Sequence, residues 1–193
     1  VQGLAYRNQG QMEDAIAILQ EAVALDPQSL SGYVILGWTQ HLAKQPEDAI
    51  ATLQVALERD PDHVPALNAL GIVYLVQGNL DQAVATHTRA RTLNPDNEIA
   101  FYNLSLAYER LGQYPEAIDH AQRATELEPG NPHPWVALAI AHAGNGDVAA
   151  AQTAYQQAIQ LDSRYTSLSF LNHLERAGFS PEQIQATRRL HSR

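Results

Sequence analysis

The sequence predicts an all-α protein, a solenoid of helix–turn–helix repeats of about 34 residues, and three regularities support this. Proline-containing segments recur at one fixed interval, at 25–27, 59–61, 93–95 and 127–129, and 161–163 takes the next place with a serine. Alanine also recurs with this spacing at two positions of the repeat, and we call each such set of equivalent positions a column. Between the prolines, apolar residues lie three and four positions apart, as in amphipathic helices. A fixed period of this length is typical of stacked repeats.

Three columns of small residues follow the period. Small side chains on both members of a helix pair let the two helices approach closely, and packing then sets their angle. Repeating that angle produces a superhelix. The alanine columns are Ala15, Ala49, Ala83, Ala117 and Ala151, and Ala22, Ala56, Ala90, Ala124 and Ala158; the third column, in the first helix of each unit, is Gly3, Gly37, Gly71, Ser105 and Ala139.

The period divides residues 1–165 into about five units. The first, 1–29, is partial because it begins within its first helix, and the full units are 30–63, 64–97, 98–131 and 132–165. Glycine-containing turns at 77–78, 111–112 and 144–146 separate the two helices of a unit. Prolines fall at or near helix starts, and those after the second helices end them. A chain that begins within a helix leads us to expect a fragment of a longer protein.

Residues 166–193 depart from the period and predict C-terminal capping helices, or equally a degenerate sixth unit. Residues 166–178 predict an amphipathic helix that ends at Gly178. The next segment begins with Ser180 as a helix cap, Pro181 at the first helical position and Gln183 in a capping-box position. A solenoid end needs a polar outer face to stop further stacking, which is the role we expect for this segment.

The repeats resemble those of the tetratricopeptide repeat (TPR) family, with its pattern W-x2-L-G-x2-Y, A-x3-F and P. LNALGIVY at 67–74 supplies the leucine, glycine and tyrosine, and 33–40, 101–108 and 135–142 keep part of the pattern. The resemblance covers residues 1–165 and implies a right-handed α-solenoid. Pentatricopeptide repeats have a similar length, but they usually bind RNA, and a net charge of -9 argues against nucleic acid.

The resemblance also implies that a protein partner, a peptide or an amphipathic helix, binds in the concave groove lined by the first helices. Each first helix carries a mostly apolar stripe there, which favours an apolar segment or an amphipathic helix. The aliphatic members either line the groove or are buried between neighbouring units. Trp38, Tyr102 and Asn68 are the stronger candidates, because aromatic anchors dominate interfaces. The predicted groove residues are Val34, Trp38, His41, Asn68, Ile72, Leu75, Tyr102, Leu106, Glu109, Val136 and Ile140.

The sequence lacks the residues that several other activities would require. TPR domains that bind chaperone tails use a clamp of lysine, asparagine and arginine, whereas Asn68 and Asn103 stand here without cations and Lys44 is the single lysine. The eight histidines show no metal-ligand spacing, and there is no cysteine. The acidic pairs at 13–14 and 47–48 suit the start of second helices. We therefore expect no enzyme activity, no cofactor and no metal.

The sequence thus predicts a non-catalytic protein-interaction scaffold, in the cytoplasm and without a membrane span, since no apolar run is long enough. Two alternatives stay open. The chain could be the regulatory or targeting region of a longer enzyme, or it could self-associate as a homo-oligomer through the groove or the terminal segment.

Overall fold

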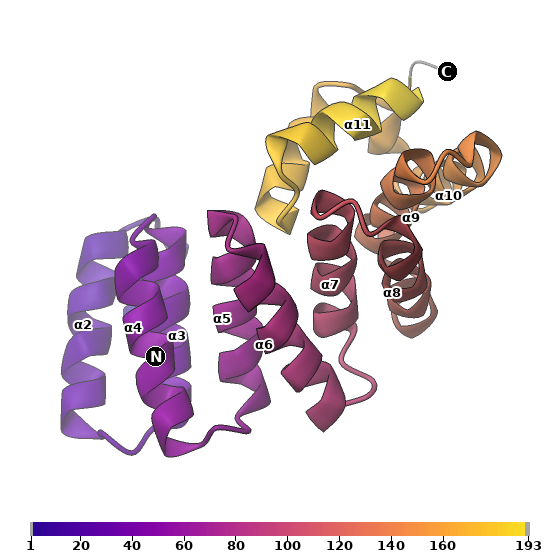
Figure 1. Cartoon of the computed structure of the whole chain (residues 1–193). Helices are drawn as coiled ribbons and strands as arrows, with labels where there is room; N and C mark the ends of the chain where they lie inside the picture. Colours follow the sequence, from indigo (N-terminus) through magenta and orange to yellow (C-terminus); the bar gives the residue numbers. More distant parts are fainter. Residues whose placement is uncertain (1, 192–193) are drawn as a thin grey trace.

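The computed structural model describes residues 2–191, and it is an all-α solenoid, as predicted. Consecutive helices pack side by side along an arc (Figure 1). The described residues form α1 (Gln2–Asn8), α2 (Met12–Leu25), α3 (Leu30–Leu42), α4 (Pro46–Arg59), α5 (Val64–Gln77), α6 (Leu80–Leu93), α7 (Glu98–Arg110), α8 (Tyr114–Leu127), α9 (Pro132–Gly144), α10 (Val148–Leu161), the 3-10 helices η1 (Ser163–Thr166) and η2 (Phe170–Ala177), and α11 (Pro181–His191).

Close approach of the two helices in a pair depends on the column of small residues in the first helix. A Cβ added at Gly37 of α3 would lie 2.7 Å from Cγ of Leu53 in α4. At Gly71 of α5 it would lie 2.5 Å from Nε2 of His87 in α6. Both distances are too short for a side chain, so the structure confirms that these positions set the helix spacing.

The turns inside the pairs share one backbone conformation. Gly78 follows α5 with a φ of 81°, in the left-handed region that glycine adopts without strain. Lys44 takes the corresponding place after α3, one repeat earlier, with a φ of 61°. The period of the sequence is therefore also a period of the backbone.

First helices of adjacent pairs pack against each other, and so do the pairs themselves. The first helices α3, α5, α7 and α9 are in contact in succession. The largest buried apolar cluster runs from α4 to α11, whereas Ile16, Leu19 and Leu36 form a separate cluster between α2 and α3. No helix within residues 2–191 is both long and apolar enough to cross a membrane.

The C-terminal segment differs from the prediction in helix type. The helix expected over 166–178 is shorter than predicted and is not an α-helix but the 3-10 helix η2, and η1 precedes it. Nδ1 of His173 lies 2.5 Å from the carbonyl oxygen of Phe170, an acceptor that an α-helix would give to the amide of Leu174. The predicted end at Gly178 is confirmed, with a φ of 87°.

The predicted capping box of α11 is also confirmed. The backbone N–H of Ser180 donates to Oε1 of Gln183 at 2.9 Å, and the N–H of Gln183 donates to Oγ of Ser180 at 3.3 Å. Together η2 and α11, joined at Gly178, form a unit that we call the C-terminal hairpin (residues 170–191). It does not simply extend the stack beyond α10, because it reaches back to α7, and Figure 1 shows α11 lying across the ends of α7 and α9.

Candidate functional site

The eleven predicted groove residues fall into two groups, a partly exposed one that we call the open part and a buried or hairpin-bonded one that we call the covered part. The open part comprises Val34, Trp38, His41, Asn68 and Ile72, all of which are partly exposed. The covered part comprises the fully buried Leu75, Leu106, Val136 and Ile140, and also Tyr102 and Glu109, whose polar atoms bond to the hairpin. The residues of the open part therefore all lie in α3 and α5.

Trp38 is the largest side chain of the open part. Its ring lies 5.1 Å from that of His41, one helical turn away in α3, and its inner edge packs on the main core. Burial lowers the pKa of His41, so its ring is neutral at pH 7. The open part thus presents a partly exposed, uncharged aromatic pair.

The side chain of Asn68 is engaged with the next unit. Its Nδ2 donates to Oδ1 of Asn97 at 3.2 Å, and Nδ2 of Asn97 donates to Oδ1 of Asn68 at 2.9 Å. Asn97 also caps α7 by accepting from the N–H of Ala100. The amide of Asn68 therefore joins α5 to the start of α7, a role that the sequence pattern did not indicate.

In the covered part, Tyr102 of α7 contacts the end of η2 and the loop that joins η2 to α11. Its hydroxyl donates to the carbonyl oxygen of Ala177 at 2.6 Å, and its ring centre lies 6.2 Å from that of Phe179. Burial raises the pKa of Tyr102 well above its ordinary value. The hydroxyl is thus a hydrogen-bond donor at any physiological pH.

Gln183 of α11 is the second polar anchor. Its Nε2 donates to the carbonyl oxygen of Leu106 at 3.1 Å and to Oε2 of Glu109 at 2.7 Å, both in α7. Burial raises the pKa of Glu109, while the Gln183 hydrogen bond and the charge of Arg110 lower it. Sequence reasoning identified Gln183 only as a capping residue, because contacts with residues more than 70 positions away leave no local pattern.

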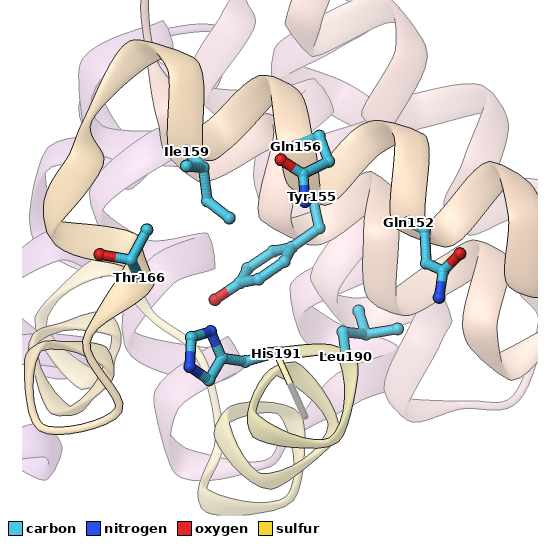
Figure 2. A pocket seen from close by; sticks show the side chains of 7 residues that line it. All are labelled: Gln152, Tyr155, Gln156, Ile159, Thr166, Leu190 and His191. Atoms are coloured by element: carbon cyan, nitrogen blue, oxygen red, sulfur yellow. The ribbon is translucent and has the colours of Figure 1, made fainter. Parts of the chain in front are cut away.

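A hollow of about 490 Å³ lies between α10 and the end of α11 (Figure 2). Figure 2 shows the Tyr155 ring lying across it, with Leu190 and His191 of α11 facing it from below. The Tyr155 hydroxyl donates to the carbonyl oxygen of Tyr165 at 2.9 Å and so serves the structure. A second hollow, of about 550 Å³, lies where η1 and η2 meet the start of α9, and both of these hollows flank the base of the hairpin.

The titratable groups do not assemble a metal site. Within residues 2–191, no group of three or more histidine, aspartate or glutamate side chains is placed to hold a metal ion. The rings of His133 and His173 lie near each other, with centres 5.6 Å apart, but Nε2 of His173 forms a hydrogen bond with the Tyr165 hydroxyl.

Two tetratricopeptide repeat family models match the chain. One covers residues 68–132, and the other covers 6–70 and 108–168. Together they span all five helix pairs. No curated protein sequence matches the chain.

Solved structures with the same fold include MamA proteins and a protein from Thermus thermophilus. A MamA crystal structure is 24% identical, with a TM-score of 0.73 over 84% of this chain and 95% of that chain. A double mutant of MamA RS-1 is 20% identical, with a TM-score of 0.75 over 83% and 90%. The Thermus protein TTC0263, described as a thermophilic TPR protein, is 22% identical, with a TM-score of 0.71 over 91% and 94%. At these identities the likeness shows the fold.

Proposed function

Because this chain belongs to the tetratricopeptide repeat family, we propose that it is a protein-interaction scaffold that binds a partner's peptide or amphipathic helix in its concave groove. Solenoids of this kind present extended concave surfaces to their partners. The proposal assigns the chain a binding role and not a catalytic one. It places first contact at the open part of the groove, around Trp38.

The single observation that carries this proposal is the partial exposure of Trp38 beside Val34, His41 and Ile72. An indole that has one edge in the core and one in solvent is rigid and offers a large apolar surface. Such aromatic anchors supply much of the binding free energy in protein interfaces. With His41 neutral, the open part favours an apolar or aromatic side chain from the partner over a charged one.

The test is affinity capture from the source organism with wild-type protein and a Trp38→Ala variant. We expect the variant to lose at least about 2 kcal/mol of binding free energy for the captured partner, measured by titration calorimetry with the purified partner. Its thermal unfolding should change little, since Trp38 is only partly buried.

Trp135 offers a matched control, because Trp135→Ala is the same chemical change at a tryptophan outside the groove stripe. Trp38→Ala protein that binds as tightly as Trp135→Ala protein would contradict the proposal. Early unfolding of Trp38→Ala alone would also contradict it, because Trp38 would then be a core residue. Tyr102→Ala is a less direct test, since it also removes a contact with the hairpin.

A further inference from the structure

The C-terminal hairpin has the chemistry of a groove ligand. Its second arm, α11, is amphipathic: Gln183, Ile184, Thr187 and Leu190 are buried, whereas Glu182, Gln185 and Arg189 are exposed. Phe179 adds a buried aromatic ring beside Tyr102. A helix that lays its apolar face into a groove is one of the recurring modes of peptide recognition.

The C-terminal hairpin also lies where a ligand of the groove would lie. The tip of the hairpin is Gly178, and a Cβ built there would lie within 4 Å of Leu75, Asn103 and Leu106, at the border between the open and covered parts of the groove. From this tip the two arms run back over α7 toward α9 and α10. The hairpin therefore covers the groove stripe that follows the open part.

The attachment at the base is incomplete. The two hollows of about 490 and 550 Å³ flank the base of the hairpin, so its packing against α9 and α10 is interrupted there. The eight residues of η2 form a 3-10 helix, a geometry with weaker hydrogen bonds that is uncommon over more than four residues. Residues 167–169, which join η1 to η2, are all exposed.

We infer that the C-terminal hairpin is a built-in, displaceable occupant of the groove, and that a partner's amphipathic helix gains the covered part by taking its place. This inference rests on the proposed function, because it concerns the same groove. In the closed state the hairpin presents its polar side outward. In the open state the stripe from Leu75 to Ile140 becomes continuous with Trp38.

The polar anchors give a sharp test, and Gln183→Glu is the key variant. A glutamate at this position still completes the capping box with Ser180, so α11 keeps its local stability. It cannot donate to Leu106, and it places a second carboxylate against Glu109. The change therefore weakens docking of the helix without weakening the helix.

Hydrogen exchange of the full chain measures this docking. We expect the amides of α11 to exchange at least about tenfold faster in Gln183→Glu than in wild type, while those of α2 to α4 stay unchanged. Tyr102→Phe removes only the bond to Ala177 and should accelerate exchange by less. Gln185→Glu is the matched control, because it is the same substitution on the exposed face of α11.

A fluorescein-labelled synthetic peptide of residues 168–191 then probes the vacated groove. We expect it to bind the Gln183→Glu chain with a Kd at least about tenfold lower than its Kd for the wild-type chain, whose own hairpin competes with it. Equal binding to both chains would overturn the inference. A second result would also overturn it: in wild type, the α11 amides exchange as slowly as the most protected amides of α5 to α9. The hairpin would then open only when the whole chain unfolds.

Neither readout uses the partner, so this test and the test of the proposed function can fail separately. Loss of the Trp38 effect would refute the groove as a partner site and leave the exchange result intact. A hairpin that does not open would leave partner binding at Trp38 intact and restrict it to the open part.

Discussion

The imidazole of His87 stands where the two preceding units have a leucine, Leu19 in the first and Leu53 in the second. It is fully buried against Gly71, and within the described residues neither ring nitrogen has a hydrogen-bond partner of normal geometry. Burial lowers the pKa of His87 to about 4, and the backbone of Gly71 offsets part of this effect. A leucine would fill the same register without burying unpaired polar atoms.

His87→Leu should therefore raise the free energy of unfolding by about 1–2 kcal/mol at pH 7. It should also reduce the acid sensitivity of the fold. Since the folded pKa lies below the unfolded value of 6.5, the unfolded chain binds the proton first as the pH falls. The wild type then loses stability steadily between pH 6.5 and about 4, by about 2–3 kcal/mol at pH 4.5 from this residue.

Urea unfolding at pH 7.5 and pH 4.5 checks both parts of this prediction. The drop in unfolding free energy between the two pH values should be smaller in His87→Leu than in wild type. An equal drop in both proteins would mean that His87 becomes protonated in the folded chain at no cost. The other histidines with lowered pKa values, His41, His120 and His133, remain in both proteins and cancel in the comparison.

At the scale of the helix pair, a glycine in the first helix is matched to a larger side chain in the second. Gly37 faces Leu53, and two units later the same register positions hold Ser105 and Ala121. In this unit a larger residue in the first helix is accompanied by a smaller one in the second, whereas Ala139 and Tyr155 of the fifth unit do not follow this rule. At Gly37 and Leu53 the two positions share one space, so a change at one should alter the cost of a change at the other.

Gly37→Ala tests this coupling. The new Cβ would lie 2.7 Å from Cγ of Leu53, so we expect a loss of about 1–3 kcal/mol in unfolding free energy, measured by denaturant titration. Leu53→Ala should cost about 2–5 kcal/mol by itself, because it leaves a cavity. The double variant should cost at least about 1 kcal/mol less than the sum, since the added methyl group no longer clashes.

Gly130→Ala is the control for this cycle, because an added Cβ there meets no atom within 4 Å. It should leave stability nearly unchanged. Strict additivity of Gly37→Ala and Leu53→Ala would show that the two side chains do not share one space.

The elements also show which features the sequence reveals. The repeat period predicted the solenoid, the glycine turns and the close helix pairs, because each of these depends on residues near one another in the chain. The capping box at Ser180 and Gln183 was visible for the same reason. The 3-10 form of η2 was not, since it depends on the bond between His173 and Phe170, a local choice that composition does not reveal.

The candidate site was harder to predict. The stripe spacing places groove residues on one face of each first helix, but the bonds of Tyr102 and Glu109 to the hairpin depend on chain that lies far away in the sequence. The pairing of Asn68 with Asn97 likewise joins α5 to the residue that caps α7. Periodicity describes what the units share, whereas these contacts arise where the units differ.

Across the whole molecule, the hairpin makes the stability of the solenoid uneven. In a repeat protein each unit contacts mainly its neighbours, so stability is close to a sum of local terms. Here the contacts from Tyr102 and Gln183 tie α7 directly to the C-terminal segment. The N-terminal pairs lack such a tie within the described chain, and α2 and α3 share a small cluster built on Ile16, Leu19 and Leu36. We therefore expect the N-terminal end to unfold at a lower denaturant concentration.

The two tryptophans report the two ends of the molecule, because Trp38 lies in α3 and Trp135 in α9. With Trp135→Phe, fluorescence follows the N-terminal end alone, and with Trp38→Phe it follows the C-terminal end. We expect the Trp38 signal to have the lower midpoint in urea. Adding Gln183→Glu to both single-tryptophan proteins should bring the two midpoints closer together, because that change removes the hydrogen bonds from the hairpin to α7. Coincident midpoints in the absence of Gln183→Glu would instead mean that the solenoid unfolds as one cooperative unit, and that contacts between neighbouring pairs outweigh the extra contacts of the hairpin.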